Sequence, residues 1–383
     1  MATVFVRTRL RTLLVAMIGL VAMLGLVAPG LPSAHAVPTD SPVDTVSLRG
    51  EVVYDLAVLD SGRVIVGGRF SAVGAYPRSN LGAILANGNV DPDFAPTTNG
   101  DVHAIAVSTN GNRIFIGGAF TEVNGQPRHN LAAIDAVTGA LIRGWRADTA
   151  GANPAVRSLA VSGGRLYVGG KFNGIDGFDK QKLAAIDARY GHVLHWATWL
   201  NGGVNEVRVA PDGTVWVGGE FTRIRGQSRP YVGGIDPVTG QPTGFVATGN
   251  DSRIITLGLS ADGDWVYTGN NSNRVNAYRP SQSGAPVWTR RPDGNTQGFA
   301  VSGTHVYLCG HMKGFPDDGS VHRYFAALDR STGATAAWDP RATGYFKGCW
   351  SLAIDGGDLY AVGGFTRFDG VTQRLFAKFG GTA

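Results

Sequence analysis

Four ionisable residues of types that carry out acid–base catalysis recur at similar intervals along the chain. Asp55, His103, Arg157 and Glu206 are separated by 48, 54 and 49 residues. If a structural repeat sets these intervals, the four side chains meet at one site, where they would suit proton transfer on a sugar or an ester. Solvated polar residues of a channel explain the same pattern, and we favour that interpretation.

A repeated unit of strands and turns sets these intervals. One unit consists of an apolar strand, a polar turn, a second strand ending in Gly-Gly-x-Phe, a loop and a third strand. Aligned on the Phe of this motif, successive units are 50, 52, 49, 51, 40 and 53 residues apart. The aligned residues are Phe70, Phe120, Phe172, Phe221, Ser272, Met312 and Phe365. Seven units of this length are typical of a β-propeller.

The strands and turns within each unit follow from their residue types. The fourth and sixth residues of the first strand are almost always apolar, which is the period of a β-strand. An Asp-x-x-Thr-Gly turn follows the third strand, and a fourth strand then ends on an aromatic residue. These aromatic residues are Phe94, Trp145, Trp196, Phe245, Trp288 and Trp338. We therefore predict an all-β fold over residues 37–383: one seven-bladed β-propeller of four-stranded antiparallel blades.

The seventh unit ends after its third strand, at Ala383. Residues 37–44 precede the first unit and have no unit of their own. We expect this N-terminal segment to supply the missing outer strand and to close the ring. An outermost strand tolerates Pro38 and Pro42, because it does not need every amide for pairing.

The combined pattern GGxFTxVNGxxRxNLAAID…TG resembles the secreted bacterial propellers of delta-60-type repeats, found especially in actinobacteria. The resemblance implies an extracytoplasmic propeller without a settled activity. The Asp-x-x-Thr-Gly turn followed by Trp also resembles quinoprotein propellers. However, Trp145 follows Gly139 at a longer distance than in that family, and an adjacent cysteine pair and an eighth blade are absent. We therefore expect no cofactor.

The N-terminal 36 residues have the features of a secretory signal peptide. Arg7, Arg9 and Arg11 precede an apolar run over residues 13–28, and Ala34-His35-Ala36 offers a cleavage site. An uncleaved membrane anchor is the alternative. Three of the 34 basic residues and none of the 29 acidic residues lie in this segment, so the remaining chain has a net charge of +2. We expect a secreted, extracellular monomer that binds neither nucleic acid nor, after cleavage, a membrane.

Residues that vary between units are the candidates for ligand binding. The second residue of the first strand varies freely, whereas the third includes two carboxylates, Asp55 and Glu206. The variable residues are Tyr54, His103, Arg157, Asn205, Ile255, Gln297 and Trp350. Because first strands are innermost in a propeller, these side chains would line the channel mouth. Trp199, Tyr345 and Phe346 add aromatic surfaces on which sugars stack.

The loop of the sixth unit is longer than the others and contains four further ligand-contacting candidates. These are His311, Asp317, Asp318 and His322. Their spacing is irregular, so we do not predict a metal site. By contrast, a basic residue recurs in this loop in most units, and we expect it to bind loop carbonyls. The recurring residues are Arg78, Arg128, Lys180, Arg229, Arg323 and Arg374.

The only two cysteines of the chain are Cys309 and Cys349, in neighbouring units. An even pair of cysteines in an exported protein indicates a disulfide.

These features favour a non-catalytic binding protein that recognises a glycan or a protein through the face formed by the D–A and B–C loops. The first alternative is a secreted carbohydrate-active hydrolase or lyase that uses Asp55, His103, Arg157 and Glu206. The second is a purely structural surface protein.

Overall fold

The strands of each repeat pair in an antiparallel sheet of their own. The structure, a computed structural model, describes residues 37–282 and 284–381, with the backbone alone described for 345–347. The predicted signal peptide therefore lies outside the described residues. Within those residues there is no helix, and thus none long and apolar enough to cross a membrane.

In every one of these sheets the first strand pairs with the second, and the second pairs with the third. The first strands are β1 (Leu48–Val58), β5 (Val102–Val107), β11 (Ala155–Ser162), β16 (Val204–Val209), β21 (Ile254–Leu259), β25 (Thr296–Val301) and β30 (Ala342–Asp355). The second strands are β2 (Val64–Val73), β6 (Arg113–Gly118), β12 (Arg165–Lys171), β17 (Val215–Gly219), β22 (Val266–Asn270), β26 (His305–Gly310) and β31 (Asp358–Phe368). The third strands are β4 (Leu81–Ile84), β9 (Leu131–Asp135), β15 (Leu183–Asp187), β20 (Val232–Ile235), β23 (Val275–Tyr278), β29 (Phe325–Asp329) and β33 (Phe376–Gly380).

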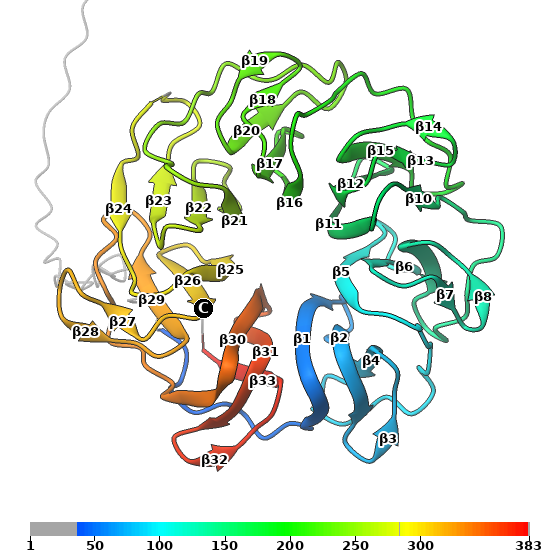
Figure 1. The fold of residues 1–383 in the computed structure, drawn as a ribbon. Coiled ribbons are helices and arrows are strands. Elements are labelled where there is room, and N and C mark those ends of the chain that lie inside the picture. The colour runs from blue at the N-terminus through cyan, green and yellow to red at the C-terminus, as the bar shows by residue number, and fades with distance from the viewer. Residues whose placement is uncertain (1–36, 283, 382–383) are drawn as a thin grey trace, which may run out of the picture. The chain divides into compact units, whose positions relative to one another are not determined.

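Short two-residue strands form hairpins in the loops between second and third strands. They are β3 (Tyr76–Pro77), β7 (Glu122–Val123), β8 (Gln126–Pro127), β10 (Thr149–Ala150), β13 (Gly174–Ile175), β14 (Phe178–Asp179), β18 (Arg223–Ile224), β19 (Gln227–Ser228), β27 (Gly314–Phe315), β28 (Ser320–Val321) and β32 (Val371–Thr372). The exception is β10, which lies between β9 and β11 and pairs with β13 of the third repeat. The first strands face a common centre (Figure 1). Consecutive first strands contact one another, and β30 contacts β1.

The prediction of four-stranded sheets is wrong for most repeats. Only the fifth repeat pairs its first three strands with a fourth predicted strand, β24 (Trp288–Arg290). Elsewhere the segment forms a single bridge, such as Ile134 with Leu141. The chain then turns, with the Trp145 amide donating to the Ile142 carbonyl over 3.0 Å. This turn ends the pairing because it carries the Trp145 ring into the core, where 1% of the residue is exposed.

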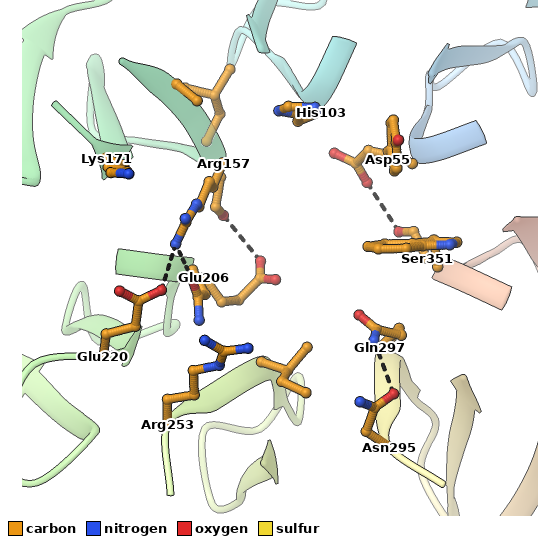
Figure 2. A pocket seen from close by; sticks show the side chains of 18 of the residues that line it. Asp55, His103, Arg157, Lys171, Glu206, Glu220, Arg253, Asn295, Gln297 and Ser351 are labelled. Atoms are coloured by element: carbon orange, nitrogen blue, oxygen red, sulfur yellow. Dashed lines mark hydrogen bonds and ion pairs between the residues drawn. The ribbon is translucent and has the colours of Figure 1, made fainter. Parts of the chain in front are cut away.

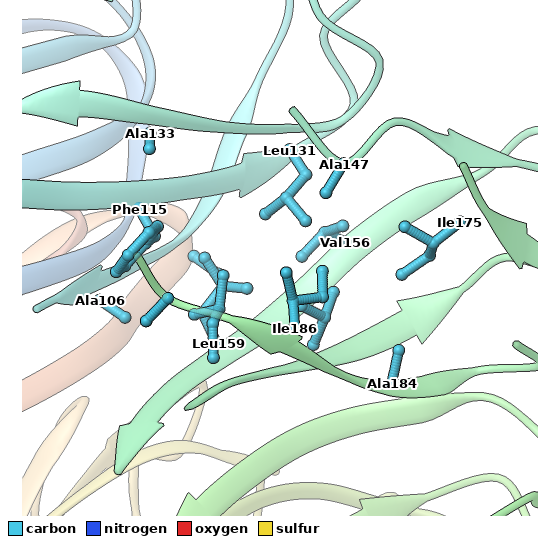
Figure 3. Close-up of a cluster of buried hydrophobic side chains, with 14 of the residues drawn as sticks. Ala106, Phe115, Leu131, Ala133, Ala147, Val156, Leu159, Ile175, Ala184 and Ile186 are labelled. Atoms are coloured by element: carbon cyan, nitrogen blue, oxygen red, sulfur yellow. The ribbon is translucent and has the colours of Figure 1, made fainter. Parts of the chain in front are cut away.

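The core lies between neighbouring sheets. Around the second and third repeats, Phe115 and Trp145 pack with Val156, Leu159 and Ile186 (Figure 3). The six aromatic residues that the sequence places at the ends of fourth strands are all buried. Each ring is thus shielded from water by side chains of the repeat core.

The Gly-Gly pair of the second repeat, Gly117 and Gly118, allows two close approaches. A Cβ on Gly117 would lie 2.3 Å from Val156 Cγ1 in the next sheet, so the first glycine permits sheet-to-sheet packing. A Cβ on Gly118 would lie 2.0 Å from the Asp101 carbonyl oxygen beside the adjoining first strand. Neither position has room for a side chain.

Positions in a first strand are counted along the sequence repeat, which begins at Val53 in β1 and at Val156 in β11. A β-bulge interrupts the pairing of every first strand at the second residue of this count. The pairing register shifts between Val53 and Asp55 in β1, and between Val102 and Ala104 in β5. The same shift occurs at the corresponding residue of β11, β16, β21, β25 and β30. A bulge breaks the strict alternation of side chains between the two faces of a strand. It therefore lets the second and third residues point toward the same space.

The recurring basic residue binds carbonyls, as the sequence predicts for a structural role. The buried Arg78 donates to the carbonyls of Phe94 and Pro92, both over 2.9 Å. Arg128, Arg229 and Lys180 likewise donate to loop carbonyls.

The alignment of this residue is wrong in the last two repeats. The backbone amide of Arg78 donates to the carbonyl of the residue that follows the Gly-Gly-x-Phe motif. In the last two repeats the amides of His322 and Gln373 make the corresponding hydrogen bond. Both are buried, whereas the neighbouring Arg323 is exposed. His322 thus occupies a scaffold position, with its ring 6.2 Å from that of Phe315.

We expect Arg78→Met to lower the free energy of unfolding by about 2 kcal/mol, because carbonyls such as those of Phe94 and Pro92 lose their buried donor. Arg323→Met is the matched control and should change stability by less than about 0.5 kcal/mol. Chemical denaturation of both variants measures the difference. Equal effects would contradict the revised alignment.

The segment that precedes β1 runs beside the last sheet. The amides of Thr39 and Val43 donate to the carbonyls of Gly380 and Lys378, over 3.0 and 2.7 Å. Trp338 Nε1 donates to the Thr39 carbonyl over 3.2 Å. Only Val43 and Lys378 form a β-bridge.

The predicted disulfide between Cys309 and Cys349 is present. It joins β26 of the sixth repeat to β30 of the seventh.

Candidate functional site

A cavity of about 630 Å³ opens where the first strands converge. Its wall includes the second residue of all seven first strands: Tyr54, His103, Arg157, Asn205, Ile255, Gln297 and Trp350. The third residues Asp55, Ser158, Glu206, Gly298 and Ser351 line it as well. The bulges explain why consecutive residues of one strand reach the same cavity.

One part of the wall is aromatic. The Tyr54 ring meets the rings of His103 and Trp350 edge to face, with centroids 5.0 and 5.1 Å apart. His311 lies next to this cluster, since its ring is 5.9 Å from that of Trp350. Its Nδ1 is 2.9 Å from Asn295 Oδ1.

The opposite part of the wall is charged and rich in amides. Arg157 Nη1 lies 3.0 Å from Glu220 Oε1 and 2.5 Å from Asn205 Oδ1. Figure 2 shows Lys171, Arg157, Glu220 and Arg253 on one side, away from Asp55 and Ser351. Asn205 Nδ2 donates to the Ile254 carbonyl over 2.6 Å, and this bond fixes the amide.

The two carboxylates of the third positions are held by neighbouring repeats. Asp55 accepts hydrogen bonds from the Ile105 amide over 2.8 Å and from Ser351 Oγ over 3.0 Å. Glu206 accepts from Ser158 Oγ over 3.0 Å and lies 3.2 Å from Arg208 Nε. These hydrogen bonds join adjacent sheets, so Asp55 and Glu206 stabilise the fold as well as lining the cavity.

Burial changes the proton affinity of these groups. It raises the pKa of Glu206 from 4.5 to about 7, against the opposing effect of Arg208. Burial also raises the pKa of Asp55. The pKa of His103 is lowered by burial, although Asp101 Oδ2 lies 3.7 Å from its Nε2. The cavity therefore favours neutral forms of both carboxyl groups and of the imidazole.

Residues 81–339 match the family model for outer membrane protein assembly factor BamB, a PQQ-like repeat. The chain belongs to this family of PQQ-like β-propeller repeat proteins. A chain in the crystal structure of the mitotic checkpoint complex has the same propeller fold. It is 16% identical, the TM-score is 0.62, and the alignment covers 97% of this chain and 99% of that chain. The search of curated proteins gave no match. The narrower resemblance to delta-60-type repeats stays a prediction.

Arg208 is one residue of this cavity that sequence reasoning missed. It is the fifth residue of its first strand, and every other repeat has Ala or Gly there. Those residues are Ala57, Ala106, Ala160, Gly258, Ala300 and Ala353. A small side chain at this level leaves space, and Arg208 occupies that space beside Glu206. The signal in the sequence was this single Arg at a position where all other repeats have Ala or Gly.

A second missed set stands at the variable position of Gly-Gly-x-Phe. Lys171, Glu220 and Asn271 occupy it in three successive repeats and line the cavity. Their variation between charged and amide types was visible in the sequence. What was missing was the strand pairing, which places this position beside the start of the first strand. Lys171, for example, pairs with Ala155 in the register of β11 and β12.

Several predicted ligand residues do not line the propeller cavity. Asp317 and Asp318 pair with the buried Arg290, at 2.9 and 2.6 Å. His322 is buried beside Phe315, and Trp199 is 49% exposed outside the cavity wall. The side chains of Tyr345 and Phe346 lie outside the described part of the chain. The long sixth loop therefore uses its acids to anchor itself to Arg290.

Among the residues that the structure describes, no group of three or more His, Cys, Asp and Glu side chains could hold a metal ion. That the protein needs neither metal nor cofactor stays an expectation.

The raised pKa of Glu206 predicts how stability changes with pH. The folded chain binds this proton more tightly than the unfolded chain, so the stabilisation is complete below pH 4.5 and is lost as the pH rises toward 7. Between pH 5 and pH 8 the wild type should lose about 2–3 kcal/mol more stability than Glu206→Gln. His103 acts in the opposite direction, but it is present in both proteins. Parallel stability profiles from denaturation at several pH values would contradict this expectation.

Proposed function

We propose that the protein binds a saccharide in the cavity where its first strands converge. The observation that carries this proposal is the composition of one wall: the rings of Tyr54, His103 and Trp350 beside the amides of Gln297 and Asn295. Aromatic rings cover the apolar faces of a sugar, while fixed amides donate to and accept from its hydroxyl groups. A concave site with these two kinds of group is typical of small-ligand recognition.

The test is incubation of the purified protein with a panel of bacterial and plant polysaccharides, scoring retention and released sugar together. We expect retention without product, and loss of retention in Trp350→Ala. Trp199→Ala is the matched control, because Trp199 is exposed outside the cavity. If Trp350→Ala binds as well as the wild type, the cavity is not the site. Absence of any retention would favour a protein ligand.

The carboxyl groups of the cavity favour a second candidate function, hydrolysis of a glycan. Glu206 would donate a proton to the leaving oxygen, because its pKa, raised to about 7, leaves a large fraction of it protonated near neutral pH. Asp55 is the second carboxyl group, and Arg157 and His103 line the same wall. Release of sugar by the wild type but not by Glu206→Gln would support this function. Turnover that survives in both Glu206→Gln and Asp55→Asn would exclude these catalytic residues.

We further propose that the propeller has seven blades and that residues 37–44 close the ring beside β33. Support comes from the contact of β30 with β1 and from the hydrogen bonds of Thr39 and Val43 to the last sheet.

Secretion of a monomer remains part of the proposal. Its support is the order of basic, apolar and small residues in the first 36 positions, together with the disulfide. N-terminal sequencing of protein from the culture medium tests it. A retained residue 1 in the cell fraction would favour the membrane anchor instead.

A further inference from the structure

The charges of the cavity wall are not balanced. Arg157 is paired with Glu220, and Arg208 lies 3.2 Å from Glu206, whose pKa burial raises to about 7. Near neutral pH Glu206 therefore offsets the charge of Arg208 only in part. Two further cations, Lys171 and Arg253, line the same cavity and are exposed. Within the described part of the chain no carboxylate forms an ion pair with either; Arg253 donates only to the amide oxygen of Asn271, over 3.3 Å.

The position of these two cations relative to the paired groups is informative. Lys171 and Arg253 lie on the side of Arg157 and Glu220 (Figure 2). The remaining acid, Asp55, lies on the other side and is occupied by Ser351 Oγ and the Ile105 amide. Asp55 therefore does not neutralise them. The cavity has an aromatic part and, apart from it, two cations that lack a counter-charge.

We infer that the ligand of this cavity is a saccharide that carries a negative charge, a carboxylate or a sulfate. Lys171 and Arg253 contact the charged group, while Tyr54 and Trp350 cover the apolar face of the ring. This inference rests on the proposed function and narrows it to one class of ligand. Both cations are exposed to solvent, so they meet the charged group while it is still partly solvated.

The test compares ligands of one shape and different charge by isothermal titration calorimetry. The probes are tetragalacturonate, its fully methyl-esterified form, and a neutral tetrasaccharide with and without a sulfate group. The wild type should bind a charged probe about tenfold more tightly than its neutral counterpart, because one charge-assisted hydrogen bond is gained. Raising the salt concentration should reduce this difference. Whichever charged probe binds more tightly identifies the charged group.

The variants separate this inference from the proposed function. Lys171→Met with Arg253→Met should abolish the preference for charge and retain weak binding of the neutral probes. The control is Lys313→Met with Arg291→Met, which removes the same charge from exposed residues outside the cavity wall. The control should bind like the wild type.

Three results would overturn the inference. Equal affinity for charged and neutral probes removes the requirement for charge but leaves saccharide binding intact. If the double variant of Lys171 and Arg253 still prefers the charged probes, other groups bind the negative charge. Absence of binding to every probe rejects the inference and saccharide binding together.

Discussion

Replacing Cys309 and Cys349 together by alanine is expected to lower the free energy of unfolding by about 4 kcal/mol. The crosslink joins residues 40 positions apart, in β26 and β30. Without it, the unfolded chain gains the conformational freedom of that loop. Both residues are fully buried, so the substitution also removes packed sulfur atoms from the core between the last two repeats.

Chemical denaturation of the wild type with and without reductant separates the crosslink from the packing. The reduced wild type should lose most of the stability that the double variant loses. Intact-mass measurement after alkylation gives an independent check. Two reactive thiols in the native protein, or an unchanged unfolding midpoint on reduction, would contradict the stabilising disulfide.

Deletion of residues 37–46 is expected to lower the free energy of unfolding by at least about 4 kcal/mol. The deletion removes the bonds of Thr39 and Val43 to the last sheet and the acceptor of Trp338 Nε1. It also removes Val46, which packs on the core next to β1. The last sheet would then expose the edge of β33 to solvent.

A point variant keeps this prediction testable if the deletion does not fold. Val43→Pro removes only the amide that donates to Lys378, and should cost about 1–2 kcal/mol. Val43→Thr retains that amide and is the control, because the Val43 side chain is half exposed. If thermal unfolding of the deletion coincides with that of the wild type, residues 37–44 do not close the ring.

The repeat register accounts for most of what could be predicted about the fold. Gly-Gly-x-Phe and the alternating apolar residues identify each first, second and third strand, because these patterns depend on local backbone geometry and burial. The fourth strands were predicted incorrectly except for β24 of the fifth repeat. In the second repeat the predicted fourth strand pairs only through Leu141 with Ile134, because a turn that buries Trp145 competes with continued pairing. A sequence pattern does not show whether burying one aromatic ring stabilises the fold more than several hydrogen bonds at a strand edge.

The candidate site was predicted in part. All seven second-position residues line one cavity, and so do Asp55 and Glu206. The longer sixth loop shifts the alignment, and only the backbone bond from His322 to the Lys313 carbonyl reveals that His322 occupies a scaffold position. Its contact with a ligand stays a prediction. Arg208 was missed because the replacement of Ala or Gly by Arg was not interpreted as a sign that this residue lines the cavity.

The sequence by itself determined which residues are common to all repeats and which are not, since each repeat meets the same packing demands. It therefore identified the basic scaffold residues of the first four repeats, the strand cores and the cysteine pair. Only the tertiary structure decided how the variable residues combine. A bulge directs consecutive side chains such as Tyr54 and Asp55 into one cavity. The acids Glu220 and Glu206 contact Arg157 and Arg208, so Lys171 and Arg253 have no carboxylate partner among the described residues. Those outcomes depend on distances between residues far apart in the chain, which no local pattern encodes.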